Sequence, residues 1–202
     1  LFDNPAAVIK DGDTILLTSG NHGTLDLRGI VNRAPITISG AAGADARFSL
    51  IQIEGASHFV FQNLTVESAT RNPNGRSLIN MRPEPTARRS DNIVFRGVRV
   101  GGKNSIAKFG RTEWAQISSD GMFMFGDCLE VQASNIHDVH NGIVLYHTNN
   151  VKIEDAEIQN FSVDGIAFSG QNIVIRNNLI HDQWPTGDDL HPDCMQGQSA
   201  PG

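Results

Sequence analysis

The sequence predicts an all-β domain in which short parallel strands wind into a β-helix, and three observations support this. A short β-branched run repeats at an interval of 22 residues, beginning at Cys128, Asn150 and Asn172. A second run repeats between the members of the first, beginning at Asp120, Asn141, Asp164 and Asp193. Patterns typical of helices are almost absent. Each turn of the chain therefore carries at least two strands at matching phases, which is typical of stacked rungs of about 22 residues.

The first element in chain order is a short helix over residues 3–10. Asp3 or Asn4 can cap its N-terminus, and Pro5 fits its first turn. We expect residues 1–12 to cover the first rung, because an uncovered rung offers bare strand edges to other chains.

Looser rungs follow at residues 58–66 and 92–100, which begin 34 and 36 residues before their successors. The surplus residues are expected to project as loops, because a rung has no room for them, and loops on a rigid scaffold often carry binding residues. These loops are residues 68–76, 82–91 and 101–120.

An antiparallel sandwich would also show short strands with frequent turn signals. Its strands have no reason to repeat the same corner residues at one interval, so the β-helix is favoured. We expect one domain over residues 1–202. The last rung, which holds Met195 and Gln196, is expected to lack a cover at its C-terminal end. Either the protein continues, or the chain is a fragment, or a partner chain closes this end.

The two cysteines are expected to remain unpaired. They lie 66 residues apart, but Cys128 matches the phase of Asn150, whereas Cys194 matches that of Gly165. No stretch approaches the roughly 20 apolar residues of a membrane span, so no membrane partner is expected.

The charge is uneven along the chain. The net charge of −6 hides a basic segment at residues 71–111, with ten Lys or Arg residues against two acidic ones. Because rungs stack, these cations are expected to form a belt with a local positive field that suits a polyanion. Nucleic acid is disfavoured by the acidic chain and by the lack of interleaved aromatic residues. Acidic polysaccharide is the better candidate, and an ordinary solvated face is the alternative.

The densest run of ionisable groups is residues 182–193, which interrupts the repeat. His191 titrates near neutrality, so with Tyr146 and Asp193 it is a candidate for removing and returning a proton beside a uronate carboxylate. Candidate substrate-binding residues are Trp184, Gln196, Arg82, Arg88, Arg89, Lys108 and Arg111, and possible calcium ligands are Asp188 and Asp189. Alternatively, Asp120, Asn141, Asp164 and Asp193 form only a corner ladder that bonds the turn backbone.

The chain also resembles a family. Residues 10–17 and 34–40 are similar to the first rungs of right-handed β-helix polysaccharide lyases of the alginate lyase and chondroitinase B type, and the later rungs resemble the pectate-lyase-like repeat. The resemblance implies a Lys base and an Arg, for which Lys103, Lys108 and Arg111 are candidates, often with calcium near acidic residues. Related uronan epimerases combine His, Asp and Tyr, and this chain carries His191-Pro192-Asp193.

The expected function is action on an acidic polysaccharide by β-elimination or epimerisation, outside the cytoplasm or on a virion surface. The alternative is a non-catalytic β-helix of a tail spike, fibre or cell-surface assembly that binds glycans. Tail spikes with this helix are commonly trimers, so a homotrimer is possible.

Overall fold

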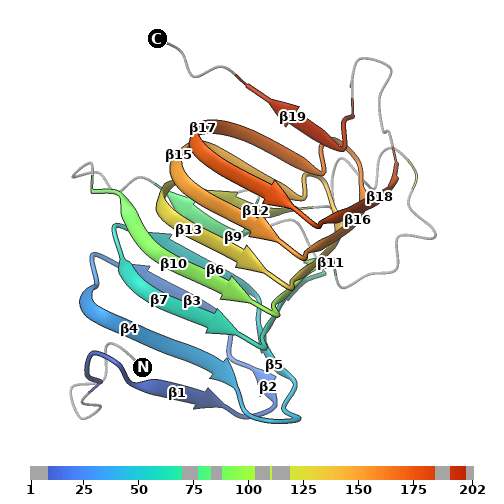
Figure 1. Ribbon diagram of the computed structural model, residues 1–202. Coiled ribbons are helices and arrows are strands. Elements are labelled where there is room, and N and C mark those ends of the chain that lie inside the picture. Colours follow the sequence, from blue (N-terminus) through green and yellow to red (C-terminus); the bar gives the residue numbers. More distant parts are fainter. Residues whose placement is uncertain are drawn as a thin grey trace.

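The computed structural model describes residues 9–69, 77–82, 88–102, 110, 119–184 and 192–198. Their strands pair in parallel throughout and stack as the rungs of a coil with three faces (Figure 1). No helix occurs within the described ranges, and so none there could cross a membrane. The predicted all-β parallel helix is confirmed.

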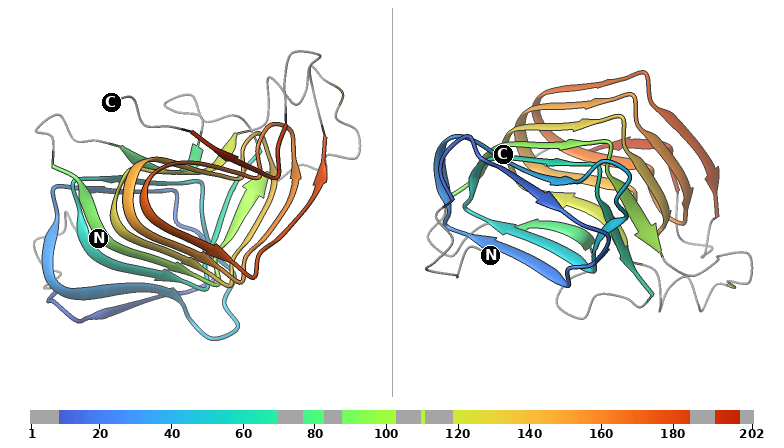
Figure 2. Two further views of the ribbon diagram at one scale, coloured as in Figure 1. Left: turned by 45° about the horizontal axis from the view of Figure 1, so that its top comes forward. Right: turned by 90° about the horizontal axis from the view of Figure 1, so that it is seen from below.

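Each face is a stack of strands from successive rungs. The left view of Figure 2 looks obliquely along the coil, so that the rungs lie one behind another. Face 1 contains β3 (Thr24–Arg28), β6 (Leu50–Glu54), β9 (Ser77–Arg82), β12 (Asp120–Met124), the first parts of β15 (Ile143–Glu154) and β17 (Ile166–Arg176), and β19 (Met195–Gly197). Face 2 contains β1 (Thr14–Leu17), β4 (Val31–Gly40), β7 (Ser57–Gln62), β10 (Ser90–Arg96), β13 (Gly126–Gln132) and the later parts of β15 and β17. Face 3 contains β2 (Gly20–Asn21), β5 (Ala46–Phe48), β8 (Thr65–Ser68), β11 (Arg99–Gly102), β14 (Asn135–Val139), β16 (Glu157–Phe161) and β18 (Leu179–Gln183).

The strand register confirms the predicted repeat. Leu129 pairs with Val151, which pairs with Ile173, so the 22-residue interval is the length of a rung. The equivalence of Asn141, Asp164 and Asp193 in the sequence predicts an outer column of Val144, Ala167 and Gln196, and these residues do pair in register. The same equivalence predicts a second column of Tyr146, Ser169 and Gln198. That column is wrong, because the register shifts after Leu145 and the buried Ser169 hydroxyl donates a hydrogen bond to the Leu145 carbonyl.

The inward side chains form one apolar column, as strand alternation predicts. Ile143, Leu145 and Ile166 are almost fully buried, while Phe168 and Ile175 are partly buried and pack against the same core. Phenylalanine rings from neighbouring rungs also stack inside: the centroids of Phe61 and Phe95 lie 5.0 Å apart. Stacking of like side chains along the axis stabilises each rung through its neighbours.

Left-handed backbone residues repeat on face 2 and explain the recurring asparagines. His58, Asn92, Cys128, Asn150 and Asn172 occupy equivalent positions with φ between 52° and 59°. Asparagine tolerates this conformation better than most residues. Both cysteines are exposed and free, as predicted.

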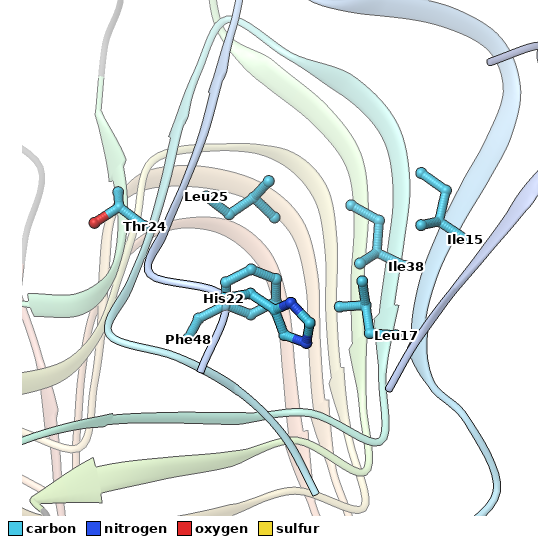
Figure 3. A pocket seen from close by; sticks show the side chains of 7 residues that line it. All are labelled: Ile15, Leu17, His22, Thr24, Leu25, Ile38 and Phe48. Carbon is cyan, nitrogen blue, oxygen red and sulfur yellow. The ribbon is translucent and has the colours of Figure 1, made fainter. Parts of the chain in front are cut away.

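The two ends of the coil differ from the middle. Ile9 and Lys10 are not helical, and the rest of the predicted capping helix lies outside the described residues. An apolar hollow of about 180 Å³ lies beside β1, and Figure 3 shows His22 and Phe48 close together at its wall. At the other end, no strand of the described ranges pairs with the outer edge of β18 or β19.

Candidate functional site

Face 1 is bordered by strands whose connections are long in the sequence. Residues 70–76, 103–118 and 185–191, which apart from residue 110 lie outside the described residues, each connect a strand of face 3 with a strand of face 1. Residues 83–87, also outside the described residues, connect face 1 with face 2. Long connections on a regular scaffold are the usual carriers of function.

The edge between faces 3 and 1, here called the insertion corner, carries a ladder of Asx side chains. The Asp120 carboxylate accepts hydrogen bonds from the backbone N–H and side-chain amide of Asn141 at 3.1 and 2.7 Å. The side-chain oxygen of Asn141 accepts a hydrogen bond from the backbone N–H of Asp164 at 3.2 Å, and the Asp164 carboxylate accepts one from the backbone N–H of Asp193 at 3.1 Å. The predicted corner ladder is confirmed: each side chain bonds the turn of the next rung.

The ladder carboxyls differ in their electrostatics. Burial alone would raise the pKa of Asp120, but hydrogen bonds from His140 and Asn141 outweigh burial and hold that pKa below its usual value. Burial raises the pKa of Asp164, and the neighbouring charge of Asp193 adds to this effect. The candidate catalytic residue Asp193 is exposed, so the ladder ends in a carboxyl group that reaches solvent.

His140 lies at the insertion corner and forms a pair with Asp120 that sequence reasoning missed. Nδ1 of His140 lies 3.2 Å from the Asp120 carboxylate, while no group of the described residues bonds Nε2. The side chain is 22% exposed. Asp120 and His140 lie on adjacent rungs, and the repeat pairs Asp120 with Asn141. The 22-residue period was therefore the signal that could have found the pair.

The opposite edge of face 1 carries an aromatic cluster, formed by Phe123, Phe125 and Tyr146. The ring centroid of Tyr146 lies 5.9 Å from Phe123 and 6.5 Å from Phe125, and the His147 ring meets it edge-on at 4.3 Å. Tyr146 is 47% exposed. The sequence predicted Tyr146 as a site residue but missed both phenylalanines, which the repeat places at outward positions of the preceding rung.

Arg89 fixes the outer edge of the aromatic cluster. Its guanidinium lies 4.3 Å above the Phe125 ring, pairs with Asp127 at 2.8 and 3.2 Å, and donates a hydrogen bond to the His147 carbonyl. Burial of Asp127 opposes ionisation, but the Arg89 bonds outweigh it and lower the pKa of Asp127. The guanidinium of Arg89 is therefore occupied by protein groups, whereas its neighbour Arg88 is exposed.

Other predicted binding residues lie at separate places around face 1. With its amide oriented to satisfy its partners, Asn80 accepts hydrogen bonds from Arg82 at 2.7 and 3.3 Å on β9. Gln196 lies on β19, in the outer column of face 1. Trp184 is half-exposed at the insertion corner, where its backbone N–H donates a hydrogen bond to the Phe161 carbonyl. Trp184 and Tyr146 thus lie on opposite edges of face 1.

The basic segment encircles the coil. Arg82 lies on face 1, Arg96 bonds Gln132 at the end of face 2, and Arg99 donates to His137 on face 3. Its described cations therefore face different directions.

Several predicted residues lie outside the described residues: His191, Lys103, Lys108, Arg111, Asp188 and Asp189. Within the described ranges no group of three His, Cys, Asp or Glu side chains is placed to hold a metal ion. Calcium binding by Asp188 and Asp189 stays a prediction.

A family model described as the right-handed beta helix region matches residues 36–183. The chain belongs to this family, which confirms the handedness that the resemblance implied. No curated protein matches the chain. No solved structure matches it either.

Proposed function

We propose that face 1 binds an acidic polysaccharide and that the protein acts on it by β-elimination or epimerisation beside a uronate carboxylate. The observation that carries this proposal is the aromatic cluster, because its rings are partly exposed side by side on face 1. An exposed aromatic surface offers apolar contact to the faces of sugar rings. Arg88 adds positive charge at the same edge, which favours an anionic chain.

Both reactions begin with removal of the proton next to the carboxylate. A base whose pKa lies near the ambient pH is suited to this step, because part of it is unprotonated and can accept the proton. Nearby cations stabilise the enolate that forms. Tyr146, His191 and Asp193 are the proposed acid–base groups, and Arg82, Arg88, Lys108 and Arg111 the proposed cations. Such substrates occur outside cells, so the proposal implies an extracellular, periplasmic or virion-surface protein.

The test is incubation of the protein in D2O with alginate, pectate and chondroitin sulfate, with a neutral glucan as control. Deuterium at the carbon next to the carboxylate reports epimerisation, which returns a proton to that carbon, and ultraviolet absorbance of an unsaturated product reports elimination, which does not. We expect exchange or an unsaturated product with at least one uronate polymer and neither with the glucan. Absence of both signals with all uronate polymers would refute catalysis.

Two substitutions of the chain's single tyrosine separate binding from chemistry. Tyr146→Phe keeps the ring and should keep polysaccharide affinity, whereas Tyr146→Ala removes the ring and should weaken binding about fivefold, as expected from loss of about 1 kcal/mol of aromatic contact. Equal affinities of both variants would contradict a role for the cluster. Loss of turnover in Tyr146→Phe with unchanged affinity would identify the hydroxyl group as the reacting one.

A second function is favoured by the same cluster, because stacking on sugars requires no acid or base. A protein that retains uronate polymers without exchange or cleavage would be a glycan-binding β-helix of a tail spike, fibre or cell-surface assembly. Sedimentation would then test the homotrimer that this class of protein commonly forms.

A further inference from the structure

Three histidines of the described rungs face carboxylates, and they differ in whether a ring nitrogen is left open. Nδ1 of His137 lies 2.9 Å from the Asp138 carboxylate, and its Nε2 accepts a hydrogen bond from Arg99 at 2.8 Å. His181 also has both nitrogens engaged, by carboxylates of its own and the preceding rung. In His140 only Nδ1 is engaged: it lies 3.2 Å from the Asp120 carboxylate and 3.2 Å from the side-chain amide nitrogen of Asn141, whose shorter bond, at 2.7 Å, goes to the same carboxylate.

The partner of His140 is itself held firmly. Asp120 is 7% exposed, and its carboxylate also accepts two hydrogen bonds from Asn141. A buried, hydrogen-bonded carboxylate that faces Nδ1 favours the tautomer with the proton on Nδ1 and a lone pair on Nε2. A base oriented in this way by a third group is the arrangement found in general acid–base sites.

The position of His140 matches that role. It lies at the insertion corner, which borders face 1, and the exposed Asp193 follows two rungs later in the ladder. A polysaccharide chain lying across face 1 from the aromatic cluster would reach this corner within the length of one strand, at most about 20 Å for six extended residues.

We propose that His140, oriented by Asp120, is the general base of this site, and that it catalyses elimination. This inference rests on the proposed function. Nε2 of His140 takes the proton from the carbon next to the uronate carboxylate. The electrons of that C–H bond form the C4=C5 double bond, and the C4–O bond breaks with its electron pair on the leaving oxygen. The imidazolium then returns the proton to that oxygen, so His140 ends neutral and the chain is cut.

Elimination is favoured over epimerisation because one base suffices when the departing proton and oxygen lie on the same side of the sugar. Epimerisation requires a second proton donor on the opposite side of the ring. Among the described residues of the insertion corner, only His140 has a ring nitrogen that is open to a substrate.

The first experiment needs no turnover. The whole protein is treated with diethyl pyrocarbonate, which modifies neutral imidazole nitrogens, and the modified histidines are identified by mass spectrometry. We expect His140 to react and His137, whose two nitrogens are engaged, to resist. Uronate oligosaccharides, and not neutral ones, should protect His140. Equal reactivity of the two histidines, or no protection, would overturn the proposal.

The second experiment measures exchange and product formation in variants. His140→Gln should lower turnover by roughly 10² to 10⁴, the contribution of a general base, while the control His137→Gln should keep it. Asp120→Asn acts on a positioning residue: it retains an oxygen acceptor for Asn141 but should shift the His140 tautomer, which ¹⁵N NMR of the imidazole detects. Melting temperatures of all three verify folding.

The outcomes separate this inference from the proposed function. Turnover that persists in His140→Gln overturns the base and leaves the function standing. Exchange without an unsaturated product overturns elimination in favour of epimerisation. Neither exchange nor an unsaturated product in the unmodified protein overturns both the enzymatic function and the base.

Discussion

Replacement of Ile166 by Asp tests whether the stacked interior columns stabilise the coil. Ile166 is fully buried on β17, and it pairs in register with Ile143 of the preceding rung and Met195 of the following one. Asp is shorter than Ile and carries a charge, so the substitution removes apolar contacts and places an ionisable group in the core.

Both effects are large relative to the stability of a domain. Loss of a buried isoleucine side chain costs about 2–5 kcal/mol. Burial of an unpaired carboxylate adds several kcal/mol. This cost arises either from desolvation of the charged group or from the raised pKa that keeps the group protonated. Since a whole domain has a free energy of unfolding of about 5–15 kcal/mol, we expect the rungs around β17 to unfold.

Hydrogen exchange measured by mass spectrometry locates the damage. Each rung contacts only its neighbours, so amides of β17 and β19 should lose protection while those of β4 to β10 keep it. Val174→Asp is the matched control, because Val174 lies on the same strand, is 44% exposed and has Lys152 as its register partner. Unchanged protection in Ile166→Asp, or equal loss in both variants, would refute the assigned inward phase.

Two further predictions concern single positions. Bonds from Glu157 and then Asp182 raise the pKa of His181 above its usual 6.5. When folding raises a histidine pKa, the protonated side chain stabilises the fold fully at a pH below the unfolded-state pKa. This stabilisation is lost as the pH rises through the folded-state pKa. His181→Gln should thus lower the melting temperature at acidic pH only. The loss in free energy of unfolding should be less than about 1 kcal/mol, because the pairs of His181 with Glu157 and Asp182 are exposed. A loss of stability confined to alkaline pH would contradict this. Gly170 has φ of 144° and its added Cβ would meet the Thr148 carbonyl, so Gly170→Ala should cost about 1–3 kcal/mol in chemical denaturation, and an unchanged midpoint would refute the strain.

The fold could be predicted from the sequence because register and side-chain phase repeat with the chain. Asn150 and Asn172 mark the same left-handed position, so the spacing between them gives the rung length directly. Along each strand, apolar residues alternate with polar ones, and the apolar set shows which side chains point into the core. Ser169 escaped prediction because a register shift after Leu145 changes which side of the strand faces the core.

The candidate site was harder to predict because its contacts join rungs of unequal length. Arg89 meets Asp127 across 38 positions and His147 across 58, since an insertion lengthens the rung between them. Arg89 looked like a free cation in the sequence, and only the structure shows that its charge is paired. The described cations of the basic segment are divided among the faces for a related reason: residues adjacent along a coil turn toward different faces.

The outward positions of the middle rungs also distinguish face 1 from the other two faces. On face 2, Lys152 pairs with Glu130 at 3.5 Å. On face 3, Arg99 and His137 are bonded to each other. On face 1, the Phe123 ring lies against Tyr146, which is 47% exposed. Exposure of aromatic area lowers stability relative to burial by about 25 cal/mol per Å², so the binding proposed for face 1 would gain free energy by covering these rings.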